Sequence, residues 1–185
     1  SHGDEVQIVD LNNDNKVIGT INGLKHVHGI ALADDFGKGY ISSGEESMVA
    51  IFDLNTMTEI KKIPVTGADP DCIVYDKFTH RVFTFNGDSG NSTVIDAKTD
   101  SVIGTIKLPG GPEFCVADGN GKLYDNIEDK SLVCVINSST MQVENTWPLA
   151  PGESPSGMAI DAKNHRLFSV CHNKTMVIMN ADNGK

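Results

Sequence analysis

The sequence is poor in several features that mark particular protein classes. No apolar run approaches 18 residues, which argues against a membrane-spanning helix. Basic residues number 15 against 25 acidic ones, and the net charge of −10 argues against nucleic-acid binding. The four cysteines form no CxxC or CxxCH motif, so covalent c-type haem is not supported. We expect the four to be buried free thiols: Cys72, Cys115, Cys134 and Cys171.

The composition that remains is that of one globular domain. The chain has 185 residues, of which 39% are hydrophobic, enough to bury a sizeable core. The first residues, SHGDEV, include neither an initiator Met nor an apolar signal region. We therefore interpret residues 1–3 as a cloning remnant and residues 4–185 as a single domain.

An internal repeat organises the sequence. Five segments share one pattern, and their anchor residues recur every 41 to 43 positions. The anchors are Asp10, Asp53, Asp96, Asn137 and Asn180. Each unit has short, β-branched apolar runs bounded by Gly, Asn, Asp or Pro, which indicates strands rather than helices. In the second unit the runs are MVAIFD (48–53), EIKKIPV (59–65), CIVY (72–75) and RVFTF (81–85).

The anchor side chains have a local structural role in this interpretation. Asp and Asn accept hydrogen bonds from backbone N–H groups a few residues on, and Thr follows three positions after three of the anchors. We therefore predict a tight turn at each anchor. Similarly, the recurring His80-Arg81 and His165-Arg166 pairs predict structural turns between the first and second strands of a unit. These turns lie on the side opposite the loops that join the second strand to the third. Trp147 occupies a column of isoleucines and is predicted to pack.

Four antiparallel strands repeated about every 43 residues predict an all-β fold, a β-propeller of four-stranded blades. The motifs SPSGMAID, RVFTFN, STVIDAKT and SVIGTIKL resemble the YVTN-type repeat of bacterial and archaeal seven-bladed propellers. The resemblance covers essentially the whole chain. Departures occur at Val27 in the Pro column, at Cys72 and Phe114 in the Gly column, and at Ile127 and Cys171 in the last Asn column. The resemblance implies a periplasmic or extracellular protein.

The number of blades is smaller than in that family. Seven blades would need about 300 residues, whereas 185 residues correspond to about four. The sequence begins at a third strand, QIVD, and ends after another, VIMN, so we expect part of a larger ring. The alternatives are a closed four-bladed ring with one surplus strand and two copies that complete a ring. Open blade edges predict self-association.

The histidines fall in the loops that enter the innermost strands. Alignment of KHVHGIA, ADPDCIV, GGPEFCV and ESPSGMA places equivalent residues at the mouth of the channel. One column contains His28, Asp71, Glu113 and Ser156, and the column two residues earlier contains His26 and Asp69. The favoured interpretation is a hydrated polar channel mouth, and the alternative is a divalent-cation site formed by His28, Asp71 and Glu113.

The loops between the second and third strands add further polar groups to the same face. They contribute Glu45, Asp88, Glu128 and His172, an acidic rim suited to a basic partner or a cationic ligand. The alternative is a set of ordinary solvated hairpin loops.

Three functional hypotheses follow. The first is a non-catalytic binding or scaffold protein that presents the channel mouth to a protein or small ligand. The second is a metal-dependent hydrolase or lactonase, in which a cation polarises a carbonyl and Asp71 or Glu113 acts as base. The third, an electron-transfer propeller, follows only from related repeat architectures.

Overall fold

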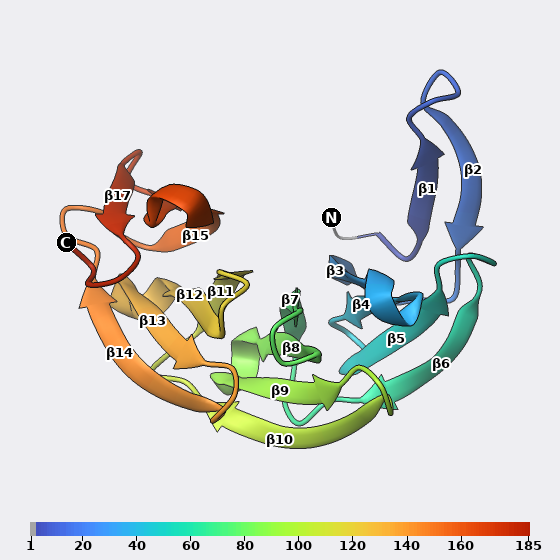
Figure 1. Ribbon diagram of the computed structural model, residues 1–185, viewed down its shortest axis with the longest axis horizontal. Helices are drawn as coiled ribbons and strands as arrows, with labels where there is room; N and C mark the ends of the chain where they lie inside the picture. Colours follow the sequence, from blue (N-terminus) through green and yellow to red (C-terminus); the bar gives the residue numbers. More distant parts are fainter. Residues whose placement is uncertain (1–2) are drawn as a thin grey trace.

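The computed structural model of the chain describes residues 3–185 as five antiparallel sheets that follow one another along the sequence (Figure 1). The first sheet comprises β1 (Val6–Asp10) and β2 (Lys16–Ile21). The second comprises β3 (Val27–Ala33), β4 (Lys38–Ser43), β5 (Met48–Asp53) and β6 (Glu59–Pro64). The third comprises β7 (Pro70–Asp76), β8 (Arg81–Asn86), β9 (Asn91–Asp96) and β10 (Ser101–Lys107).

The last two sheets continue the same order. The fourth comprises β11 (Pro112–Ala117), β12 (Lys122–Ile127), β13 (Leu132–Asn137) and β14 (Gln142–Pro148). The fifth comprises β15 (Pro155–Asp161), β16 (Arg166–Cys171) and β17 (Met176–Asn180). Short 3-10 helices cover Asp34–Phe36 (η1), Gly87–Ser89 (η2), Glu128–Lys130 (η3) and Ala162–Asn164 (η4). Within the described chain, no helix is both long and apolar enough to cross a membrane.

The predicted all-β class and the predicted blades are therefore confirmed. The sheets form an arc in which β3, β7, β11 and β15 lie on the concave side and β6, β10 and β14 on the convex side (Figure 1). The first strand of each full sheet contacts the first strand of the next. The β1–β2 sheet and the β15–β17 sheet stand at opposite ends of the arc and share no strand pairing. The closed four-bladed ring is thus not the arrangement adopted.

The predicted cloning remnant is only partly within the described residues. Residues 1 and 2 lie outside them. Gly3 forms an isolated antiparallel bridge with Val27, whose N–H donates to the Gly3 carbonyl at 2.8 Å.

The core consists of apolar layers between neighbouring sheets. Phe83 and Phe85 are completely buried in the layer between the third and fourth sheets. Trp147 packs at the edge of the next layer, 6.0 Å from the Tyr124 ring, as expected for a packing residue. All four cysteines are free and buried, as predicted. Because the apolar side chains of each layer come from two successive sheets, their burial stabilises the stacking of those two sheets.

The anchor residues form the turns predicted from the sequence. The side-chain oxygens of Asp10 and Asn180 accept from the backbone N–H two positions on, at 2.9 Å and 2.8 Å, and those of the other three anchors from the N–H three positions on. The pairs are Thr56 to Asp53 at 2.7 Å, Thr99 to Asp96 at 2.8 Å and Thr140 to Asn137 at 3.0 Å. These bonds lower the pKa of the Asp53 and Asp96 carboxyls, because backbone N–H groups favour the ionised form.

The residue after each of the last three anchors joins two sheets. Its carbonyl accepts a hydrogen bond from a side chain on the second strand of the preceding sheet, a contact we call the carbonyl clasp. The clasps are Tyr40 Oη to Ala97 O at 3.2 Å, Arg81 Nη1 to Ser138 O at 2.7 Å and Tyr124 Oη to Ala181 O at 2.8 Å. Burial raises the pKa of Tyr40 and Tyr124 well above the usual range, so both remain donors.

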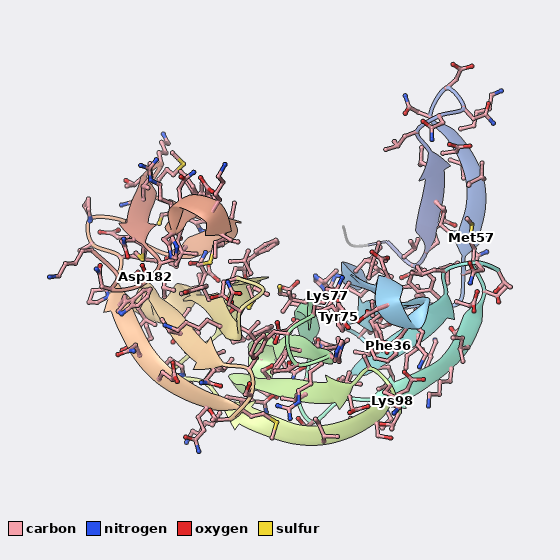
Figure 2. All side chains as sticks on the ribbon, in the orientation of Figure 1. Phe36, Met57, Tyr75, Lys77, Lys98 and Asp182 are labelled. Atoms are coloured by element: carbon pink, nitrogen blue, oxygen red, sulfur yellow. The ribbon has the colours of Figure 1, made fainter. Side chains whose placement is uncertain are left out.

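The N–H of the same residue closes the turn within its own sheet. It donates to the carbonyl of a residue in the left-handed region just before the second strand. His80 (φ 55°) accepts from Ala97 at 3.1 Å, and His165 (φ 52°) accepts from Ala181 at 2.8 Å. The predicted structural turns at these histidines are confirmed. Phe36, which Figure 2 labels, packs against one of these histidines: the Phe36 and His80 ring centroids are 5.5 Å apart.

Removing a buried clasp should destabilise the fold. Tyr124→Phe deletes the donor to Ala181 while keeping the ring, and we expect the free energy of unfolding to fall by about 1–2 kcal/mol. Urea denaturation measures the change. The matched control is Tyr75→Phe, because the Tyr75 hydroxyl bonds to Asp35 in an exposed setting. Equal losses in both variants would contradict a special role for the clasp.

The predicted self-association has a structural basis in the last sheet. Met176 and Ile178 are 55% and 54% exposed. They occupy the positions of Val133 and Val135, which are 0% exposed because the next sheet covers them. Among the described residues, β17 pairs only with β16, so one strand edge is also open.

We expect the chain to associate through this edge and face. Ile178→Lys should lower the apparent mass measured by light scattering at high protein concentration, because a charge on the face opposes pairing. Ile60→Lys, which alters another exposed apolar residue on β6, is the control and should leave the mass unchanged. A monomeric wild-type chain across the concentration range would refute the prediction.

Candidate functional site

A β-bulge begins each innermost strand. On β3, three steps separate Val27 from Ile30, whereas their partners Ser43 and Ile41 on β4 are two apart. The same irregularity recurs in β7, β11 and β15. The extra residues fall within 28–29, 71–72, 113–114 and 156–157, so the predicted column of His28 and its equivalents sits in the bulges. Bulges re-aim side chains and are common beside binding sites.

In each of the last four sheets, a backbone hydrogen bond joins the loop between the second and third strands to the loop that enters the first strand. Three of the accepting residues are in the left-handed region: His26 and Asp69 with φ of 55°, and Ser154 with φ of 47°. The bonds are Gly44 N to His26 O at 2.9 Å, Gly87 N to Asp69 O at 2.9 Å, Glu128 N to Gly111 O at 3.0 Å and His172 N to Ser154 O at 3.1 Å. The predicted common face of these two loop sets is thereby confirmed.

The predicted cation ligands come together in part. His28 Nδ1 lies 3.0 Å from Asp71 Oδ1, and only 10% of the His28 side chain is exposed. Glu113 lines the same hollow as these two residues, between β3, β7 and β11. Burial raises the pKa of Glu113, and the neighbouring Asp71 and Glu128 carboxylates raise it further.

A second cluster shares His28 with this trio, and the sequence placed its other two members, His26 and Asp69, only on the general ligand face. His28 Nε2 is 3.3 Å from His26 Nδ1 and 3.8 Å from Asp69 Oδ1. One ligand atom from each of the three residues lies within 4.8 Å of the others. The His26 and His28 rings meet edge to face, with centroids 4.4 Å apart.

An acidic hollow of about 230 Å³ adjoins this cluster. Its side-chain lining is almost entirely carboxylate: Asp69, Asp71, Asp88, Glu113, Glu128 and Asp129. His172 joins its edge, with Nδ1 3.7 Å from Glu128 Oε1. Asp129 was not among the predicted residues, and its carboxylate accepts a hydrogen bond from Gly111 N at 2.8 Å.

Two predicted residues lie apart from these groups. Glu45 is exposed and lines neither hollow. Ser156 lies in the β15 bulge, where its carbonyl accepts a hydrogen bond from Asn126 Nδ2 at 3.0 Å, and its side chain also lines neither hollow. The structure therefore brings His28, Asp71 and Glu113 to one hollow, whereas Ser156 takes part through its backbone carbonyl alone.

Sequence reasoning missed a buried acid beneath the site. Asp125 on β12 is 0% exposed, and neither carboxyl oxygen has a hydrogen-bond partner among the described residues. Its cross-strand neighbours are Cys115 and Cys134. Burial raises its pKa well above the ordinary value, and the Glu113 charge adds to the shift. The sequence did contain a sign of this residue, because Asp125 aligns with Thr84 and Ser169 in the second strands of the neighbouring repeats.

Comparisons with known proteins support the fold. Neither protein-family models nor curated proteins give a match to the sequence. Among solved structures, U3-55K is similar with a TM-score of 0.86 and 9% identity, over 100% of this chain and 57% of that one. The mitotic checkpoint complex gives 0.83 and 14%, over 96% and 56%. Kuenenia stuttgartiensis hydrazine synthase gives 0.77 and 15%, over 85% and 47%.

These likenesses show a β-propeller fold. The chain spans about half the length of the solved structures that it matches. Assignment to the YVTN-type repeat stays a prediction, because identities of 9–15% are informative about fold alone.

The buried acid should make stability depend on pH. Above the unfolded-state pKa of about 3.9, the unfolded chain releases the Asp125 proton while the folded chain keeps it, so stability falls as pH rises toward the folded pKa. Asp125→Asn removes this effect. Its stability advantage should grow between pH 5 and pH 7, by up to about 1.4 kcal/mol per pH unit.

Urea denaturation at several pH values tests this expectation. Asp34→Asn is the control, because it removes one carboxylate from an exposed position outside the hollow and so reports the effect of a lost negative charge alone. A pH-independent difference for Asp125→Asn would show that the carboxyl is ionised in the folded protein.

Proposed function

We propose that the chain is part of a non-catalytic propeller that binds a cationic partner in its acidic hollow. The observation that carries the proposal is the concentration of carboxylates from the third and fourth sheets and their loops around one hollow. Its described lining has no Lys or Arg, and Lys130, outside the lining, pairs among the described residues with Asp129 alone, at 3.1 Å. A concave surface of one sign concentrates the field and attracts ligands of the opposite sign.

The electrostatics of the hollow favour a bound positive charge. Asp71 and Glu128 both raise the pKa of Glu113, which means that these carboxylates repel one another. The His172 ring beside Glu128 offsets the repulsion only in part. A Lys or Arg side chain from a partner would relieve the repulsion and satisfy several oxygens at once. We therefore propose a Lys-rich or Arg-rich protein segment as the ligand.

The similar solved structures are compatible with a scaffold role. One of them is the mitotic checkpoint complex, in which a propeller of this fold takes part in an assembly. Hydrazine synthase shows that the fold also occurs in an enzyme, so fold alone does not decide between these classes.

Binding of a fluorescent oligolysine peptide tests the proposal. We expect anisotropy to reveal binding that weakens with added salt. The triple variant Asp88→Asn, Glu113→Gln, Glu128→Gln should weaken it at least about tenfold, because three attractive charges are lost.

A charge-matched control separates the hollow from the overall acidity of the chain. Asp34→Asn, Glu59→Gln, Glu144→Gln removes the same charge from exposed positions outside the hollow. This variant should retain most of the affinity. Equal weakening by both triples would mean that net charge alone attracts the peptide, and absence of binding by the wild type would refute the proposal.

A further inference from the structure

We propose that His26, His28 and Asp69 form a binding site for a zinc-type transition-metal ion, with Asp71 as an outer-shell residue. The ligand atoms are His26 Nδ1, His28 Nε2 and Asp69 Oδ1. The site goes beyond the peptide-binding proposal, because it lies at the edge of the acidic hollow and has a different ligand chemistry. It also differs from the set predicted from the sequence, which joined His28 to Asp71 and Glu113.

The spacing of the three atoms matches a tetrahedral ion. Zinc bound about 2.0–2.1 Å from each ligand places the ligand atoms roughly 3.3–3.4 Å apart. The separation of His28 Nε2 from His26 Nδ1 is 3.3 Å, and that from Asp69 Oδ1 is 3.8 Å. All three lie within 4.8 Å of one another. Closure around an ion therefore needs these separations to shorten by at most roughly 1.5 Å, within reach of a turn of the flexible Asp69 side chain.

The second ring nitrogen of His28 has the partner that a metal-bound histidine requires. Its Nδ1 is 3.0 Å from Asp71 Oδ1. When Nδ1 carries the proton and donates to this carboxylate, Nε2 presents its lone pair to the metal. A carboxylate in this position fixes the tautomer and the ring orientation and makes the imidazole a stronger ligand. Asp71 thus acts through His28 and is no ligand itself.

Gly44 provides the space for the cluster. A Cβ built on this residue would lie 2.5 Å from Asp69 Oδ1 and 3.0 Å from His28 Nε2. Its φ is not in the left-handed region, so the backbone conformation does not require glycine here. The missing side chain therefore serves the close approach of the ligand atoms. Because the Asp69 carboxylate is the end of a flexible side chain, Gly44→Ala would displace it without preventing folding.

The donor set selects the class of metal. Two imidazole nitrogens and one carboxylate oxygen suit Zn²⁺ and its neighbours, whereas Ca²⁺ takes six to eight oxygen ligands. Three protein ligands leave the fourth tetrahedral position open. Glu113, the third member of the predicted trio, lines the adjoining hollow and is absent from this cluster.

Calorimetric titration of the purified chain with ZnCl2 tests the site. We expect one equivalent to bind, with Ca²⁺ unable to compete. His26→Ala, His28→Ala and Asp69→Asn should each weaken binding at least about tenfold. Asp71→Asn should weaken it about 10- to 100-fold while the stoichiometry stays at one. Gly44→Ala should weaken binding with all ligands present. Co²⁺ in place of zinc should give the absorption bands of a four-coordinate ion.

The controls separate this set from the alternatives. His165→Ala alters a single exposed His–Asp pair, with His165 Nδ1 3.0 Å from Asp182 Oδ1, and should leave zinc binding unchanged. Circular dichroism verifies that each variant is folded. Loss of binding in Glu113→Gln but not in His26→Ala or Asp69→Asn would overturn the assigned ligands, and a folded wild type that binds no zinc would overturn the site. Neither result bears on oligolysine binding, which is measured with a chelator present.

Discussion

The carbonyl clasp is the interaction on which the stacking of the sheets depends. The residue after each of the last three anchors satisfies its N–H within its own sheet and its C=O with a side chain of the preceding sheet. Both groups would otherwise be left without partners beside an apolar layer, at a cost of about 1–3 kcal/mol each. The same residue therefore ends one turn and sets the separation of two sheets. Tyr and Arg both serve as donors, because only reach and an N–H or O–H are needed.

The ligand face depends on a similar division between backbone and side chain. The bulge and the bond from the second-to-third-strand loop hold each entering loop in place through backbone atoms. The side chains at these positions are therefore not needed to hold the loops in place. His26 and Asp69 occupy equivalent positions with equal φ, yet they carry different chemistry. This freedom explains how one sector gathers nitrogen ligands while the next gathers carboxylates.

The sequence predicted the parts of the structure that repeat. The anchors, the strands and the shared face of the two loop sets all follow from spacing, because each repeat imposes the same local hydrogen bonds. It did not predict the bulge, since the extra residue shifts the alternation of apolar residues by one position near the start of a strand of six or seven residues, too short a pattern to reveal the shift. Without the bulge, columns of equivalent residues suggest a ring of His28, Asp71 and Glu113. In the structure His28 keeps Asp71 as a neighbour at 3.0 Å through Nδ1, and its Nε2 approaches His26 and Asp69.

Departures from the repeat were the least predictable features. Asp125 replaces the Thr or Ser of other sheets, and its burial without a partner depends on the packing of Cys115 and Cys134 around it. The clasp donors Tyr40 and Tyr124 read as ordinary core residues in the sequence. Their hydroxyl partners lie 57 residues away along the chain and become neighbours only when the sheets stack.

The open arc has a consequence for cooperativity. Among the described residues, the main contacts of each sheet are with its neighbours along the chain, so the molecule behaves as a linear array whose end sheets have one such interface and whose inner sheets have two. Amide exchange through local opening should then be fastest in β1–β2 and β15–β17 and slowest in the third and fourth sheets. His26 and His28 belong to the second sheet and its entering loop, whereas Asp69 precedes β7 of the third. An ion bound by these residues would link the second sheet to the third. Local opening that starts at the β1–β2 end would then extend less readily into the second sheet.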